Sequence, residues 1–119
     1  MKRTLILIIS LFNLSLAGSE LNQIQIKTIV DAIRRVEGSP TYGIKSVHFK
    51  NQIEARAICA RTVQNTYSRW KNSNQKITYF EFLSKRYAPI GAGNDPHNLN
   101  KNWLRNFTNS LPKNFTNSL

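Results

Sequence analysis

Apolar residues recur with helical spacing between Leu21 and Gly38. At about 100° per residue, Ile29, Val30 and Ile33 fall within about 60° of Ile26 on a helical projection. The charged residues of the segment lie on the flanks or the opposite side. Gly38 is a favourable helix end, and Pro40 forbids a simple continuation. The pattern therefore predicts an amphipathic helix over residues 21–38.

Three further helices follow from capping signals and periodicity. Asn51 with Glu54 three residues later predicts the start of a long helix that ends near Asn72. Thr78 and Glu81 form a second capping pair, and that helix should end near Tyr87 because Pro89 follows. Residues 90–97 are a loop by composition, and a last helix is expected from Leu99 to about Phe107.

The segment from Thr41 to Phe49 has β-branched and aromatic residues with some alternation, so it could form a short β-hairpin or an irregular loop. The expected fold class is therefore mainly α, a small helical domain with a short hairpin or loop after its first helix.

The first 17 residues have the three-part plan of a secretory signal peptide. Lys2 and Arg3 form a positive start, residues 5–16 are mostly apolar, and Ser15 and Ala17 are the small residues before a cut at Gly18. The alternatives are an uncleaved anchor or an N-terminal helix of the domain. The expected location is secreted or periplasmic, and the lone Cys59, with no thiol to pair with in the chain, should be buried.

Composition and charge limit the classes of protein to which the chain can belong. The chain has 119 residues, 17 basic and 6 acidic, and a formal net charge of +11. Its 40% hydrophobic content is too high for a disordered polycation, and one Cys and two His argue against a disulfide scaffold, a metal site or a cofactor built on these residues. Basic residues occur in every expected helix instead of one cluster. This favours an anionic cell-wall or membrane surface over nucleic acid as the partner of a monomeric protein.

The C-terminus contains an exact repeat. Residues 106–111, Asn-Phe-Thr-Asn-Ser-Leu, recur at 114–119. The two copies are offset by eight residues, which is too short a period for a solenoid unit. We therefore expect one domain over 18–110 followed by a duplicated, frayed tail over 111–119.

Glu37 is the acidic residue with the most unusual position. It lies about 20° from Ile26 on the projection, inside the apolar stripe and in the last helical turn. A carboxylate there is poorly hydrated and gains nothing from the helix dipole, and both effects favour the protonated form that a general acid requires. If the helix ends one residue early, Glu37 instead turns into water.

The stretch from Ala32 to Val47, with Glu37, Gly38 and then Tyr42-Gly43-Ile44, resembles the lysozyme-like superfamily, in particular soluble lytic transglycosylases and goose-type lysozymes. Residues 82–89, 94–95 and 102–103 are similar to the endings of small phage and bacterial muramidase-like domains.

This resemblance implies a set of site residues. Glu37 would be the catalytic acid/base, and Tyr87, from a later helix, would approach it. The substrate groove would be lined by Tyr42, Gly43, Ile44, Ser46 and Asp95. Ser46 departs from the family pattern, which often has Gln there. The alternative for Tyr87 is that it is an aromatic residue of the core and has no catalytic role.

The implied activity is cleavage of the MurNAc–GlcNAc bond of peptidoglycan. Hydrolysis needs two carboxylates, whereas a lytic transglycosylase needs one, so a transglycosylase is the first expectation. Asp95 would be the second carboxylate of a muramidase, or else only a turn residue. A non-catalytic, basic cell-wall-binding module is the other alternative.

Overall fold

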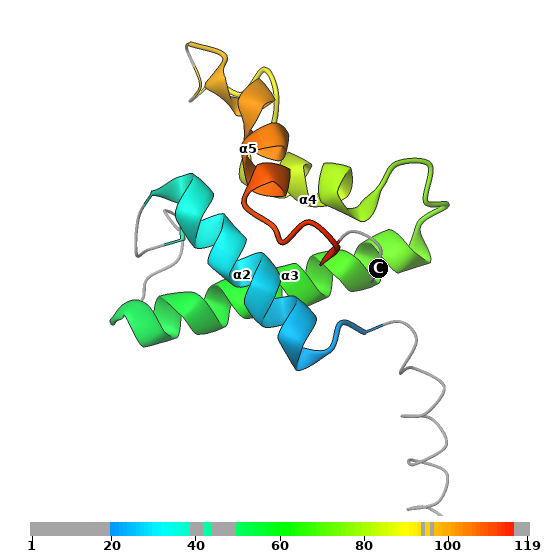
Figure 1. Ribbon diagram of the computed structural model, residues 1–119. Helices are drawn as coiled ribbons and strands as arrows, with labels where there is room; N and C mark the ends of the chain where they lie inside the picture. Colours follow the sequence, from blue (N-terminus) through cyan, green and yellow to red (C-terminus); the bar gives the residue numbers. More distant parts are fainter. Residues whose placement is uncertain (1–19, 39–41, 44–49, 94, 96, 116–119) are drawn as a thin grey trace, which may run out of the picture.

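The computed structural model of the protein describes residues 20–38, 42–43, 50–93, 95 and 97–115 (Figure 1). Within these ranges the chain is helical and contains no strand. Its helices are α2 (Gln23–Glu37), α3 (Gln52–Asn72), α4 (Tyr79–Tyr87), the 3₁₀ helix η2 (Leu99–Asn102) and α5 (Trp103–Asn109). The mainly α class is confirmed. The hairpin expected between the first two helices falls on residues 41–49, of which only Tyr42 and Gly43 are described; they form a turn.

The helix ends follow local chemistry. The Asn51 side chain accepts a 3.0 Å hydrogen bond from the Glu54 N–H, as the sequence predicts. Helix α2 begins at a reciprocal box that the sequence reading overlooked: Asn22 accepts from the Gln25 N–H, and the Gln25 side chain accepts from the Asn22 N–H. It ends at Gly38, whose φ of 64° is the left-handed conformation that glycine adopts without strain.

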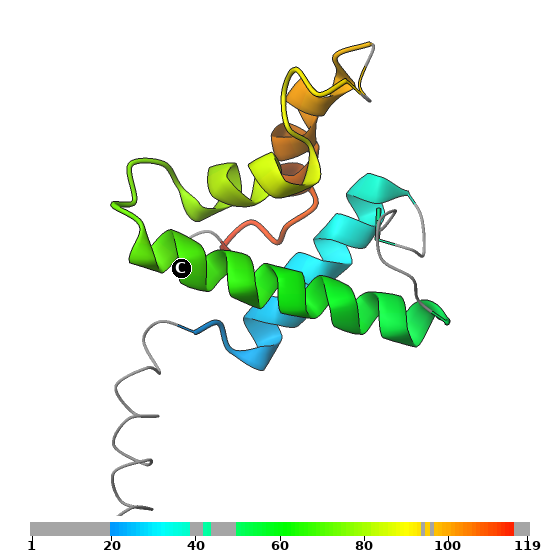
Figure 2. The same ribbon diagram turned by 180° about the vertical axis from the view of Figure 1, so that it is seen from behind.

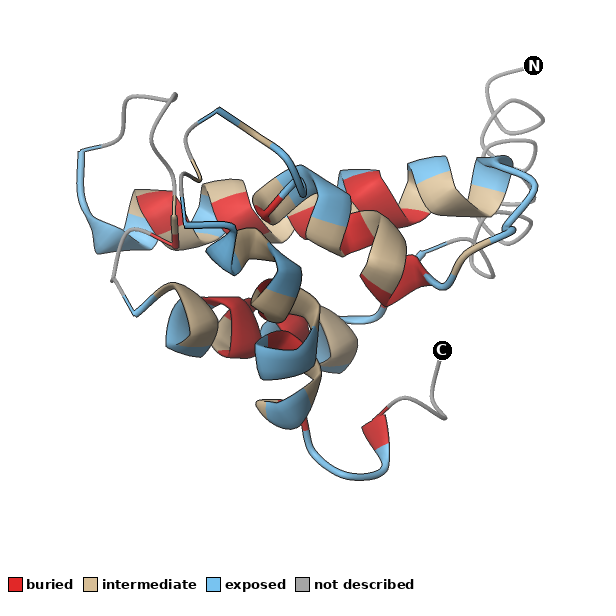
Figure 3. Cartoon of the chain, turned by 90° about the horizontal axis from the view of Figure 1, so that it is seen from above, coloured by how far each residue is buried: buried red, intermediate tan, exposed pale blue. Residues whose placement is uncertain are grey.

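The four α-helices pack around one core. Helix α2 crosses the long α3 and also contacts α5, while α4 packs against both α3 and α5 (Figures 1 and 2). Fully buried side chains from all four helices meet between them, including Ile33, Val63, Leu83 and Phe107. Figure 3 shows the buried residues on the faces that the helices turn toward one another. Cys59 is fully buried in this core, as expected.

The C-terminal segment corrects one expectation. Leu111 and Phe115 are buried, so a frayed tail is wrong for residues 111–115, whereas 116–119 lie outside the described residues. The Phe115 ring stacks on Phe80 with centroids 6.2 Å apart, and Phe107 meets Phe80 edge-on at 5.2 Å. Each copy of the repeat thus supplies a phenylalanine to Phe80, and burial of an aromatic ring offsets the entropy cost of ordering the segment.

In the described part of the chain, none of the helices has both the length and the apolar character needed to cross a membrane. Residues 1–17, which carry the expected signal peptide, lie outside that part.

Candidate functional site

Glu37 is the last residue of α2, where that helix approaches α5. Its side chain is half-buried, and its Oε1 atom accepts a 3.1 Å hydrogen bond from the indole N–H of Trp103. Trp103 is the first residue of α5 and is buried. Since α2 packs on α5, two elements that are distant in sequence fix the carboxylate.

The backbone of Gly43 lies against the same carboxylate. A Cβ atom added to Gly43 would come within 2.6 Å of the Glu37 Cδ atom, closer than real Cβ contacts allow. Tyr42 and Gly43 both adopt positive φ, 57° and 71°. The positive φ therefore favours glycine at this position, and a larger residue would force the end of the Glu37 side chain to move.

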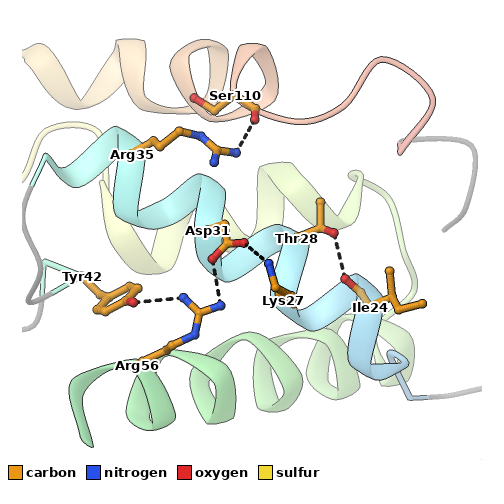
Figure 4. Close-up of polar contacts among 8 residues, drawn as sticks. All are labelled: Ile24, Lys27, Thr28, Asp31, Arg35, Tyr42, Arg56 and Ser110. Carbon is orange, nitrogen blue, oxygen red and sulfur yellow. Dashed lines mark hydrogen bonds and ion pairs between the residues drawn. The ribbon is translucent and has the colours of Figure 1, made fainter. Parts of the chain in front are cut away.

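Tyr42 anchors this turn to the helices. Its side chain is buried, and its hydroxyl accepts a 3.0 Å hydrogen bond from Arg56 Nη1 (Figure 4). The Nη2 atom of Arg56 lies 2.8 Å from Asp31, and Lys27 binds the other oxygen of Asp31 at 2.8 Å. The Tyr42 side chain thus ties the turn to α2 and α3, and its expected contact with substrate stays a prediction.

The Asp31 carboxylate depends on its two basic neighbours. Partial burial by itself raises the pKa of Asp31, but the hydrogen bonds from Lys27 and Arg56 and the attraction of their charges outweigh that effect, and the pKa lies below its ordinary value. The cluster is therefore ionised at neutral pH, and it holds Arg56 in place for Tyr42.

The hydrogen bond found for the Tyr87 hydroxyl is with Cys59 and not with Glu37, the partner that the family resemblance implies. The hydroxyl lies 3.4 Å from the Cys59 sulfur and shares a hydrogen bond with it. Burial raises the pKa of both groups, that of Cys59 to about 11. The Tyr87 ring stacks on Trp103 with centroids 5.5 Å apart and planes 6° from parallel. Tyr87 therefore supports the carboxylate through Trp103, and the catalytic role expected for its hydroxyl stays a prediction.

Asp95 occupies a turn that leads into η2. Its Oδ1 atom accepts from the Leu99 N–H at 2.8 Å and its Oδ2 atom from the Asn100 N–H at 2.9 Å. Both oxygens are thus engaged by backbone donors, the arrangement of a turn residue. Of the two roles that the sequence left open for Asp95, this geometry favours the turn.

The remaining expected site residues, Ile44 and Ser46, lie outside the described residues. The residue that sequence reasoning missed is Trp103, the donor to Glu37. Its signal was present: a tryptophan four residues before Phe107 on one helical face is expected to be buried, and a buried indole N–H needs an acceptor.

A cavity of about 280 Å³ adjoins the Tyr42 turn, and Arg34, Tyr42, Ile53 and Arg56 are among the residues that line it. Across the described ranges, no group of three or more His, Cys, Asp or Glu side chains could hold a metal ion.

The chain matches no family model, no curated protein and no solved structure.

Proposed function

We propose that this protein is an exported peptidoglycan-cleaving enzyme that acts on the MurNAc–GlcNAc bond as a lytic transglycosylase, with Glu37 as its acid and base. One observation carries the proposal. The Glu37 carboxylate is half-buried at a helix end, held between the Trp103 indole and the Gly43 backbone, and it forms no ion pair with any described residue.

This arrangement suits a carboxyl group that must both give and take a proton. Trp103 fixes Oε1, while no described residue donates a hydrogen bond to Oε2. A side chain fixed through one oxygen keeps its other oxygen at a constant position for proton transfer. A carboxylate paired with Lys or Arg would instead be held in its charged form.

The proposed reaction uses Glu37 twice. Its proton passes to the glycosidic oxygen as the bond from C1 to that oxygen breaks. The C6 hydroxyl of the muramoyl residue then forms a bond to C1 and gives its proton to the Glu37 carboxylate. The products are a free hydroxyl on one fragment and a 1,6-anhydro end on the other, and no water is consumed.

The hydrogen bonds of Asp95 support a mechanism with one catalytic carboxylate over a mechanism with two. A muramidase needs a second carboxylate free to act as base or nucleophile, whereas two backbone N–H groups occupy the Asp95 oxygens. The basic surface supports the choice of an anionic polymer as substrate, since 15 basic and 6 acidic residues remain if residues 1–17 are removed.

The test is clearing of a peptidoglycan suspension by the purified chain. Glu37→Gln keeps the side-chain shape but removes the transferable proton, so the rate should fall by about a hundredfold or more with the circular dichroism spectrum unchanged. Glu20→Gln, at an exposed position, is the matched control and should keep the wild-type rate.

Mass spectrometry of the products separates the mechanisms. Anhydro ends with an active Asp95→Asn variant support a transglycosylase, whereas reducing ends with an inactive Asp95→Asn variant indicate a two-carboxylate muramidase. Binding to peptidoglycan without cleavage would indicate the non-catalytic module.

A further inference from the structure

A second concave surface lies away from Glu37, between the start of α4 and the helices η2 and α5. It encloses about 640 Å³, within the range of roughly 300–1,000 Å³ typical of small-molecule sites. Neither Glu37 nor the residues described around it line this groove.

The floor of the groove is apolar because its aromatic residues use their polar atoms elsewhere. Trp70, Tyr79, Phe80 and Leu104 line it. The Trp70 indole N–H donates to the Ile77 carbonyl at 2.8 Å, and the Tyr79 hydroxyl donates to the Val63 carbonyl at 2.9 Å. Both rings therefore offer carbon surface to the groove and are held rigidly by these bonds.

The edge of the groove is basic on the side of α5. Lys101 and Arg105 lie four residues apart, are both exposed, and form no ion pair with the described residues; Arg105 Nη2 donates a 3.3 Å hydrogen bond to the neutral Asn102 side chain. Glu81, the one acidic side chain among the described residues that line the groove, accepts a hydrogen bond from the Thr78 hydroxyl at 3.1 Å as part of the α4 cap. A ligand in the groove thus meets carbon along its length and two unpaired positive charges at one edge.

We propose that this groove binds a free single-chain fatty carboxylate, with the acyl chain along the aromatic floor and the carboxylate at Lys101 and Arg105. An arginine guanidinium matches the planar carboxylate, and the adjacent lysine adds a second charge. The volume is sufficient for one acyl chain. The site is independent of the activity proposed for Glu37.

The experiment titrates the full mature chain with sodium decanoate below its micelle concentration by isothermal calorimetry. Trp70 fluorescence provides a second signal, because this residue lines the site. One decanoate should bind per chain, about tenfold more tightly than the uncharged decanol of the same length. The double variant Lys101→Gln/Arg105→Gln should bind decanoate no more tightly than decanol.

The matched control is Arg61→Gln/Lys85→Gln, which removes the same charge from exposed positions that do not line the groove. This variant should bind decanoate like the wild type. An equal loss in both double variants would show general attraction to a basic protein and overturn the proposal. Absence of saturable binding, or binding only to anionic vesicles, would overturn it as well. The Glu37→Gln variant should bind decanoate normally, so the outcome does not depend on the proposed enzyme activity.

Discussion

The indole N–H of Trp103 donates to the carboxylate of Glu37 across 66 positions of the chain, at a distance of 3.1 Å. Behind it, Trp103 stacks on Tyr87 on one side and on Phe107 at 5.0 Å, and the Tyr87 hydroxyl bonds to Cys59. The candidate acid is therefore positioned by the first residue of α5, and the aromatic stack fixes that residue in turn.

Replacement of Trp103 by Phe should impair turnover more than folding. The ring stack survives while the N–H is lost, so Glu37 loses its anchor. We expect kcat for peptidoglycan cleavage to fall by about tenfold or more, the effect of one hydrogen bond of about 1–2 kcal/mol. KM should change little, because Trp103 is buried.

Trp70→Phe is the control for this prediction. It removes the same N–H from a tryptophan that bonds to the Ile77 carbonyl and not to Glu37. Wild-type kcat in Trp103→Phe, or an equal drop in both variants, would contradict the positioning role.

Gly43→Ala should affect both stability and activity. The added methyl group would come within 2.6 Å of the Glu37 carboxyl carbon, at a residue whose φ is already 71°. We expect the free energy of unfolding to fall by about 1–2 kcal/mol from left-handed strain, because the Glu37 carboxyl group is the end of a flexible side chain and can move aside. Urea denaturation measures the loss, and the displaced carboxylate should lower the cleavage rate.

Gly38→Ala separates the effect of left-handed backbone strain from the effect of the contact with Glu37. Gly38 has a similar φ of 64°, but an added Cβ would meet nothing within 4 Å. It should cost about 1–2 kcal/mol, the strain alone, and leave kcat almost unchanged. Equal kcat values in the two alanine variants would show that the contact between Gly43 and Glu37 does not affect activity.

The local features of the fold were predictable from the sequence, because they depend on neighbours three or four residues apart. Gly38 as the end of the first helix, Asn51 as a cap and Cys59 as a buried residue are of this kind. The place of Glu37 in the apolar stripe likewise predicts that its side chain is partly buried, as it is.

Contacts between distant segments could not be predicted from such local patterns. Periodicity assigns Tyr87 to a buried helical face, but it does not say whether its hydroxyl faces Glu37 or Cys59. The expectation of a frayed tail was wrong for a related reason. The repeated sequence does not indicate that Phe107 and Phe115 both contact Phe80. Which rings meet depends on helix crossing, and the local pattern does not encode it.

Phe115→Ala should destabilise the whole domain. Phe115 is buried and stacks on Phe80, so its loss removes apolar contact from the core. Because the residue lies at the edge of the core, we expect a cost of about 2–3 kcal/mol, below the usual range for a central phenylalanine. Lys113→Ala, at an exposed position in the same segment, should cost less than about 0.5 kcal/mol. Equal thermal unfolding of the two variants would mean that residues 111–115 add nothing to stability.

The Cys59 thiol should make stability fall at alkaline pH. Burial raises its pKa to about 11 in the folded protein, against 9.0 for an exposed thiol. Between these values the unfolded chain releases the proton while the folded chain keeps it, so raising the pH favours unfolding, by at most about 1.4 kcal/mol per pH unit. The contribution of the thiol is fully present below pH 9 and is lost toward pH 11. Urea denaturation at pH 8, 9 and 10 should therefore show a decline that is smaller in Cys59→Ala. Since burial also raises the pKa of Tyr79 and Tyr87, an unchanged slope in Cys59→Ala would assign the whole decline to other groups such as these and contradict the role of the thiol.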